Sequence, residues 1–431
     1  MRLCTRAIRR LEPSRRQFLT GAAAALAAPA LLRGRAFAAD GPVRIGFVTP
    51  QTGPLAFFGE PDAFVLKRFE KLIGAGVQVN GTTRPIEIIV KDSQSNANRA
   101  AEVASELLLE NEVSLLLAAG GPDTVNPVAD QAEANGTPMI ATACSWQSFV
   151  FGRGSAPDKG FDWTYLFAFG LEDVIAAYMG LWSTIETNKR IGILLPNDAD
   201  GNAWGDAKFG FPPALAAAGY EVIDTGRYTP MLDDFTAQIS ALKSAGVDIV
   251  MGTMIPPEFF SFWSQSAQQG FKPKVATIGK ALLLPSTLEA VGDIGDGLSS
   301  ELGWHPTYPF TSAATGETAR DIASAWEAET GRQWIQTIGL KHALLDLAID
   351  VVGRAGNPQD PAAMIEAIRA TDRETTLGRA NWAASPIRNV AKAPMVGGQW
   401  RKTEGRFELV VCSNPGGAAA PATSDLLPLK G

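Results

Sequence analysis

Residue types that usually carry catalysis or metal binding are scarce in this chain of 431 residues. It has only two histidines, His305 and His342, and three cysteines. No G-x-S-x-G elbow, glycine-lysine phosphate loop or HExxH pair occurs, and no spacing singles out a pair of catalytic carboxylates. We therefore expect no enzyme, with no catalytic residue, metal site or cofactor. His342 is expected to be an ordinary helix residue, and His305 is not expected to touch a ligand.

Long apolar runs are absent apart from one near the N-terminus. That run, residues 19–32, is rich in alanine and shorter than the ~20 residues needed to span a bilayer. Arginines precede it, and Ala36-Phe37-Ala38 offers the small residues of a cleavage site. The sequence Ser14-Arg15-Arg16-Gln17-Phe18-Leu19 resembles a twin-arginine export signal. We therefore expect residues 1–38 to be a signal peptide and the mature protein to be periplasmic.

Basic residues are also scarce once the signal is set aside. The signal contains eight arginines and one glutamate, which leaves 30 basic and 44 acidic residues and a net charge of −14. A body this acidic lacks the basic footprint that nucleic acids require. It is equally unsuited to direct adhesion to anionic lipid. We expect neither nucleic acid nor direct membrane insertion after signal removal.

Two cysteines remain after the signal, Cys144 and Cys412. They either form a bridge in the oxidising compartment or stay as two separate buried thiols, and we expect the second arrangement. No cysteine stands at the cleavage site, so a lipid-anchored product is not expected.

From residue 40 onward, short apolar strands alternate with helices. The first series has strands at 43–48, 86–91, 113–118 and 138–142, and helices at 60–73, 98–110 and 125–135. After a glycine-rich insert the second series has strands at 190–195, 221–228, 247–251 and 274–278, and helices at 172–187, 203–218, 235–245 and 257–269. Helices at 318–330 and 340–355 and a β-rich segment from 375 follow. This alternation predicts two α/β units with mostly parallel sheets, each borrowing late segments.

Four stretches along the chain match one family in the family's order. They are Ile45–Gly59 (IGFVTPQTGPLAFFG), Ile88–Asp92 (IIVKD), Gly136–Thr142 (GTPMIAT) and Thr376–Trp382 (TLGRANW). Together they resemble the type I periplasmic binding proteins of branched-chain amino acid ABC transporters, the leucine/isoleucine/valine-binding type. The resemblance implies two doubly wound parallel-sheet lobes, joined by three hinge crossovers, that close on a ligand in the cleft.

The resemblance also places the lobes along the chain. The crossovers are expected near Leu166–Gly170, Gly297–Gly303 and Thr375–Gly378. Lobe 1 would then hold residues 39–167 and 301–375. Lobe 2 would hold residues 168–300 and 376–431.

The site is expected at loops beyond the carboxyl ends of the strands, where ligands bind in doubly wound sheets. In similar proteins an aromatic residue at the place of Phe58 covers the ligand, although Phe57 and Phe58 could both be core. The loop AGGPDT follows, with Gly121 and Thr124 as ligand contacts. Its glycines let the backbone approach a carboxylate, and pure helix capping by Asp123 or Thr124 is the alternative.

The loop after the fourth strand is the strongest candidate. The resemblance places a ligand-binding carbonyl at Ala143 and a hydroxyl with its N–H at Ser145. Trp146 is too large to be fully buried in a loop, which favours a ligand contact.

The fourth loop, in the second lobe, contains Trp204 where relatives place an aromatic residue over the ligand. Asp198, Asp200 and Asn202 imitate the opening of a calcium loop. Ala203 stands where that loop needs glycine and no glutamate follows at the required distance, so we expect turn-forming residues and helix N-terminal charges instead.

Lys280 departs from the family pattern. Amino-acid-binding relatives use an acidic side chain at this place to pair with the ligand's ammonium group. A lysine would repel an ammonium group and attract a carboxylate, so one hypothesis is a carboxylate without an α-amino group. Walls formed by Phe58, Trp146 and Trp204 would favour an aromatic one. The alternative is that Lys280 points to solvent.

These observations predict the extracytoplasmic solute-binding component of an ABC transporter. Its partners would be a small organic carboxylate or amino-acid-like ligand and a membrane permease. A monomer is expected because hinge closure must remain free. Two alternatives stay open, a sensory ligand-binding protein that docks to a receptor and an exported hydrolase.

Overall fold

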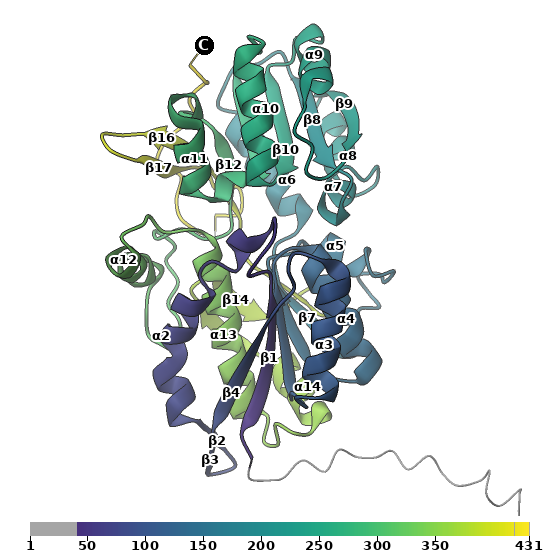
Figure 1. Cartoon of the computed structure of the whole chain (residues 1–431), viewed down its shortest axis with the longest axis vertical. Helices are drawn as coiled ribbons and strands as arrows, with labels where there is room; N and C mark the ends of the chain where they lie inside the picture. Colours follow the sequence, from purple (N-terminus) through teal and green to yellow (C-terminus); the bar gives the residue numbers. More distant parts are fainter. Residues whose placement is uncertain (1–40, 418, 431) are drawn as a thin grey trace, which may run out of the picture. The chain divides into compact units, whose positions relative to one another are not determined.

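The computed structural model describes residues 41–417 and 419–430. The predicted signal peptide, residues 1–38, lies outside the described residues. Two large sheets and two small hairpins organise the rest (Figure 1). The small hairpins pair β2 (Val77–Val79) with β3 (Thr82–Arg84) and β13 (Asp372–Thr375) with β14 (Gly378–Asn381).

The first large sheet has six parallel strands in the order β15-β7-β6-β5-β1-β4. Its strands are β1 (Val43–Thr49), β4 (Ile86–Asp92), β5 (Leu115–Ala119), β6 (Met139–Thr142), β7 (Thr164–Ala168) and β15 (Val390–Lys392). Its neighbouring helices are η1 (Ala56–Phe58), α2 (Asp62–Ala75), α3 (Ala97–Leu109), α4 (Pro122–Asn135), α5 (Trp146–Val150), α12 (Ala319–Thr330), α13 (Thr337–Arg354) and α14 (Pro361–Arg369).

Helices cover both faces of this sheet, which explains its continuous apolar strands. In β5, Leu115 and Leu117 share a core with residues of α2 and α13. Leu116 and Ala118, which point the other way, share a second core with residues of α3 and α4. The doubly wound arrangement predicted from the alternation of strands and helices is therefore confirmed.

The second large sheet has seven strands in the order β17-β16-β12-β11-β10-β8-β9. Its strands are β8 (Arg190–Pro196), β9 (Glu221–Tyr228), β10 (Ile249–Met254), β11 (Val275–Lys280), β12 (Ser299–Leu302), β16 (Val396–Lys402) and β17 (Phe407–Ser413). The first five are parallel, whereas β16 and β17 run antiparallel to their neighbours. Its helices are α6 (Leu171–Trp182), α7 (Ala199–Trp204), α8 (Phe211–Ala217), α9 (Thr236–Ser244), α10 (Pro256–Gln268), η2 (Ala281–Leu283), α11 (Pro285–Val291) and η3 (Gly292–Gly295).

One predicted helix in the second series was wrong. The expected helix at 203–218 is two short helices, because α7 ends at Trp204 and α8 begins only at Phe211. Pro212 and Pro213 fit the first turn of a new helix but not a helix interior. The helix expected at 172–187 also ends early, at Trp182.

The chain passes between the two large sheets three times. The first passage, at Phe169 and Gly170, joins β7 to α6, and the second begins at Gly303 after β12. The third lies at residues 393–395, between β15 and β16. It was expected at Thr375–Gly378, but those residues close the β13–β14 hairpin, where the Thr375 hydroxyl donates to the Gly378 carbonyl at 2.8 Å. Because β15 pairs with β7, residues 376–392 accompany the first sheet.

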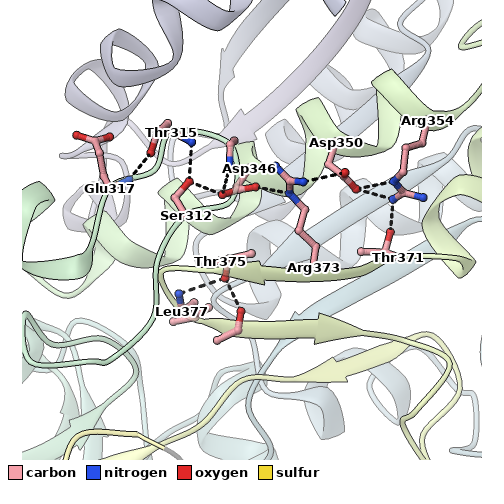
Figure 2. A network of polar contacts seen from close by, with 12 residues as sticks. Ser312, Thr315, Glu317, Asp346, Asp350, Arg354, Thr371, Arg373, Thr375 and Leu377 are labelled. Atoms are coloured by element: carbon pink, nitrogen blue, oxygen red, sulfur yellow. Dashed lines mark hydrogen bonds and ion pairs between the residues drawn. The ribbon is translucent and has the colours of Figure 1, made fainter. Parts of the chain in front are cut away.

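A chain of buried polar contacts fixes the return segment after the second passage (Figure 2). The Ser312 hydroxyl donates to Asp346 on α13, and Asp346 accepts Arg373 Nε of β13 at 2.6 Å. Arg373 also donates to Asp350 at 3.0 Å, and Arg354 continues the chain by donating to Asp350. Two aspartates and two arginines thereby join three segments that are distant in sequence.

The two cysteines of the described region are separate. Cys144 follows β6 of the first sheet and Cys412 lies in β17 of the second, and both are free and buried. The expectation of two buried thiols is confirmed and the bridge is excluded in this structure.

Candidate functional site

A cavity of about 60 Å³ lies among loops at the carboxyl ends of strands from both large sheets. The first sheet's elements contribute Phe58, Ala143, Cys144, Gln336 and Leu340. The second sheet's elements contribute Asp200, Trp204, Thr253, Lys280, Leu283 and Glu301. This is the position at which doubly wound folds bind ligands.

Each of the three passages also contributes one lining residue. These are Phe169 on the first passage, Gly303 on the second and Met395 on the third. A molecule in the cavity would therefore touch both sheets' loops and all three connections between them.

Four of the eight residues predicted from the sequence line the cavity: Phe58, Ala143, Trp204 and Lys280. Phe58 is buried beside Phe57, with ring centroids 4.5 Å apart. Trp204 stacks on Phe211, with ring centroids 5.0 Å apart, and this contact fixes the plane of the indole. The structure thus brings together residues from loops that are separated by more than two hundred positions in the sequence.

The other four predicted residues do not line the cavity. Ser145 caps α5, because its hydroxyl accepts the Ser148 N–H at 3.3 Å, and the Thr124 hydroxyl lies 3.3 Å from Ser93. Gly121 donates its N–H to the Ala143 carbonyl at 3.0 Å.

Trp146 is directed away from the cavity by its place at the start of α5. Its indole N–H donates to both carboxylate oxygens of Glu172 at 3.0 Å. Glu172 lies in the first turn of α6, so Trp146 joins α5 to α6 beside the first passage.

Lys280 does not point to solvent, because its side chain is only 9% exposed. Its ammonium group lies 2.8 Å from Asp200 and 3.4 Å from Asp198. Burial alone would lower the pKa of Lys280, but the charges of Asp200 and Asp198 raise it, so the lysine is cationic. The charge that the sequence offers to a ligand carboxylate is therefore already neutralised by two carboxylates of the protein.

The backbone at Lys280 has the uncommon angles φ 59° and ψ −70°, which is a strained γ-turn conformation for a residue with a side chain. Buried Glu301 supports this conformation, since its carboxylate accepts the Lys280 backbone N–H. Glu301 also accepts the Tyr178 hydroxyl at 2.6 Å and the Ser300 hydroxyl at 3.0 Å. Strain of this kind persists only where surrounding contacts hold it, and it is concentrated at functional sites.

A third carboxylate adds to the negative charge of this region. Asp123, at the start of α4, accepts the backbone N–H of Ala199 at the start of α7. Burial, followed by the charges of Asp200 and Asp198, raises the pKa of Asp123 to about 6. The group of Asp123, Asp198, Asp200 and Lys280, hereafter the acidic cluster, therefore carries more negative than positive charge at neutral pH.

The carboxylates of the acidic cluster are engaged by groups of the protein itself. Asp198 caps α7 by accepting the Gly201 N–H at 2.7 Å, and Asp200 pairs with Lys280. Within residues 41–417 and 419–430, no group of histidine, cysteine, aspartate or glutamate side chains has an arrangement that could hold a metal ion.

Four polar lining residues were not among the predicted ligand contacts: Asp200, Thr253, Glu301 and Gln336. Gln336 accepts the Gly303 N–H at 2.9 Å and donates to the Glu301 carbonyl at 3.3 Å. Thr253 and Glu301 could have been found from the rule used for the other loops, because both lie at or near the carboxyl ends of parallel strands. Gln336 carried no such signal.

Comparison with known proteins identifies the family. The family model described as periplasmic binding protein matches residues 42–405. The chain belongs to this family. A model of the twin-arginine translocation signal matches residues 12–31, so this periplasmic binding protein is exported and periplasmic. In the part of the chain that the structure describes, no helix combines the length and apolar character of a membrane span.

A curated relative supports the type of binding protein. The Leu/Ile/Val-binding protein homolog 7 of Brucella suis biovar 1 is 25% identical over 274 residues, which is 62% of this chain and 66% of the relative. The chain thus matches slightly less than two thirds of that relative's length. The family predicted from the sequence is confirmed.

Solved structures show the same fold at low identity. The leucine-binding protein LivK of Thermotoga maritima MSB8 has a TM-score of 0.70 and 21% identity, covering 86% of this chain and 99% of its own. A solute-binding protein of an ABC transporter from Rhodopseudomonas palustris BisB5, in complex with 3,4-dihydroxybenzoic acid, has a TM-score of 0.70 and 19% identity, covering 89% and 98%. The type I fold predicted from the sequence is confirmed by these likenesses.

Proposed function

We propose that this periplasmic binding protein is the extracytoplasmic component of an ABC importer. It captures a small organic carboxylate or amino-acid-like ligand in the cavity between the two sheets and delivers it to a membrane permease. It acts as a monomer, by hinge closure of two lobes built on the two sheets. The lobe that carries the first sheet also carries residues 376–392, because β15 pairs with β7.

The observation that supports this proposal most directly is which parts of the fold supply the residues that line the cavity. Lining residues come from both sheets and from all three passages, so a bound molecule would link the lobes and the hinges at once. A cavity of roughly 150 Å³ is needed to hold benzene. The cavity of about 60 Å³ is smaller, so a ligand the size of leucine or benzoate requires the lobes to separate before it binds.

Two ligand chemistries fit the charges on this wall. Lys280 is the only cation among the described lining residues, and it would receive a carboxylate if it released Asp200 or Asp198. An amino acid would instead place its ammonium group against Asp200 or Glu301. The similar solved structures are named for a leucine-binding protein and for a complex with 3,4-dihydroxybenzoic acid, and both molecules carry a carboxylate.

A thermal-shift screen of the protein purified from the periplasm tests the proposal. The panel should contain amino acids, aliphatic acids, aromatic acids and amides. A compound present at 100 times its Kd stabilises the folded state by about 2.7 kcal/mol, which gives a clear rise in Tm. A hit among non-amino carboxylates supports the role of Lys280 as a ligand contact. A hit among amino acids supports the binding role and argues against that account of Lys280.

A cavity-filling variant separates binding at this site from binding elsewhere. A side chain at Gly303 would extend toward Leu340 and Met395, whose nearest atoms lie 3.9 Å from its first carbon. Gly303→Leu should therefore fill the cavity and abolish the shift caused by the hit. Gly74→Leu is the matched control, because no atom lies within 4 Å of the added carbon on the outside of α2. An equal shift in the two variants would contradict the proposed site.

A further inference from the structure

Thr253 has a buried hydroxyl that nothing in the described structure satisfies. The residue is 1% exposed, and its hydroxyl has no hydrogen-bond partner. Leaving such a group unpaired costs free energy, and most buried polar groups in proteins are paired for that reason. Thr253 also lines the cavity, so a ligand that enters the cavity lies beside this residue.

The surroundings of Thr253 locate this hydroxyl relative to the other polar groups. Thr253 lies opposite Gly279 in the pairing of β10 with β11, and the next pair is Met254 with Lys280. Gly279 must lack a side chain, because an added carbon would lie 2.9 Å from both Trp204 and Glu301. Thr253 therefore lies on the same face of the second sheet as Glu301 and the Trp204 ring, beside the pair that contains Lys280.

We propose that Thr253 is a specificity-determining contact, whose hydroxyl forms a hydrogen bond with an oxygen or nitrogen atom of the ligand. The inference rests on the proposed binding function. The Thr253 hydroxyl would favour ligands that present a polar atom to the second sheet's side of the cavity. Ligands that are apolar at that place would bind more weakly. A hydroxyl both donates and accepts, so a carboxylate, hydroxyl, carbonyl or amino group satisfies it. A site built to make such a bond discriminates strongly against an analogue that lacks the partner atom.

Removal of the Thr253 hydroxyl should raise the stability of the ligand-free protein and weaken ligand binding. Thr253→Val keeps the branched shape and removes the unpaired hydroxyl, so the ligand-free protein should gain about 2 °C in Tm. The same variant should bind roughly tenfold more weakly to leucine or to 3,4-dihydroxybenzoate, whichever binds the unaltered protein. Thr253→Ser, which keeps the hydroxyl, should retain the affinity.

Thr277 in the adjacent strand is the matched control. It is as buried as Thr253, but its hydroxyl accepts the Trp182 indole N–H at 2.8 Å and lies 2.8 Å from Ser299. Thr277→Val should therefore lower the Tm, because it leaves Trp182 unpaired, and should leave the affinity unchanged.

Each outcome decides one of the two proposals. A Tm that falls in Thr253→Val, or an unchanged affinity for a probe that binds, would overturn the inference about Thr253. If neither leucine nor 3,4-dihydroxybenzoate binds the unaltered protein, the proposed ligand range fails for these two compounds. The Tm comparison between the Thr253 and Thr277 variants then tests the premise. A rise in the first and a fall in the second support it, and a fall in both overturns the inference because the Thr253 hydroxyl would already be paired.

Discussion

The network around α13 and the acidic cluster beside the cavity both contain buried charges, but these charges are arranged differently. The network joins Asp346 and Asp350 to Arg373 and Arg354, so every negative group has a cation (Figure 2). The acidic cluster sets three aspartates beside Lys280 alone. Balanced charges hold segments together, whereas an excess of one sign leaves a site that responds to protons or to a charged ligand.

The largest effect is expected when the balanced network loses a cation. Arg373→Met leaves Asp346, which is 0% exposed, without any cationic partner. Removing one partner of a buried pair costs about 3–5 kcal/mol, and we expect a loss of this size in the free energy of unfolding in urea. Arg379→Met is the control, because Arg379 and its partner Asp372 are 69% and 44% exposed, and such pairs contribute about 0–1 kcal/mol. Equal losses in the two variants would show that the buried network does not stabilise the fold.

Removal of the cation from the acidic cluster should lower the free energy of unfolding by a smaller amount. Lys280→Met removes the only cation of the cluster, but Asp198 is 21% exposed and Asp123 can take up a proton. We expect a loss of about 2 kcal/mol near neutral pH, measured by urea unfolding. The loss should shrink as the pH falls below about 6, since protonation of Asp123 removes one of the repelling charges. A loss that is independent of pH would contradict the charge imbalance.

An effect of similar size, spread over a range of pH, concerns Asp123 alone. The pKa of Asp123 is about 6 in the folded protein and near 3.8 in the unfolded chain, so the folded state binds more protons between these two values. Stability contributed by this group is present at low pH and is lost as the pH rises toward 6 and above. Asp123→Asn should abolish this loss, so its free energy of unfolding relative to the unaltered protein should increase by about 2 kcal/mol between pH ~4 and ~7.

The free energy of unfolding must be compared between Asp123→Asn and the unaltered protein. The reason is that two histidines change this free energy with pH in the opposite direction to Asp123. Burial lowers the pKa of His305 and of His342 to about 4, so both destabilise the folded state as the pH falls from about 6.5 toward 4. They affect both proteins equally and cancel in the difference. Parallel stability curves for Asp123→Asn and the unaltered protein would refute the assignment.

The fold was largely predictable because its signals are local. Apolar strands such as 113–118 and the helices between them give a pattern that only two doubly wound units satisfy. The third passage was misplaced because β15 has only three residues and is defined by pairing with β7, which no local pattern encodes. The helix expected at 203–218 failed for a local reason that was overlooked, the prolines at 212 and 213.

The site was predictable in position but only partly in detail. Comparison with the family pattern picked out Phe58, Ala143, Trp204 and Lys280, which line the cavity. The rule that ligands lie beyond the carboxyl ends of strands gave only the region. It could not give the direction of Trp146, which depends on where α5 begins and on the distant Glu172. The aspartates that neutralise Lys280 were visible in the sequence, but their approach to it is a tertiary contact.

The late position of β15, β16 and β17 has a consequence for the order of events during synthesis. The first sheet is completed by β15, which leaves the ribosome only after all five parallel strands of the second sheet, and the second sheet is completed later still. Each sheet therefore depends on strands that are made late in the sequence, although domains often fold in order of synthesis. A twin-arginine signal belongs to a pathway that carries proteins that have already folded, and such a pathway suits a fold whose two sheets both wait for late strands.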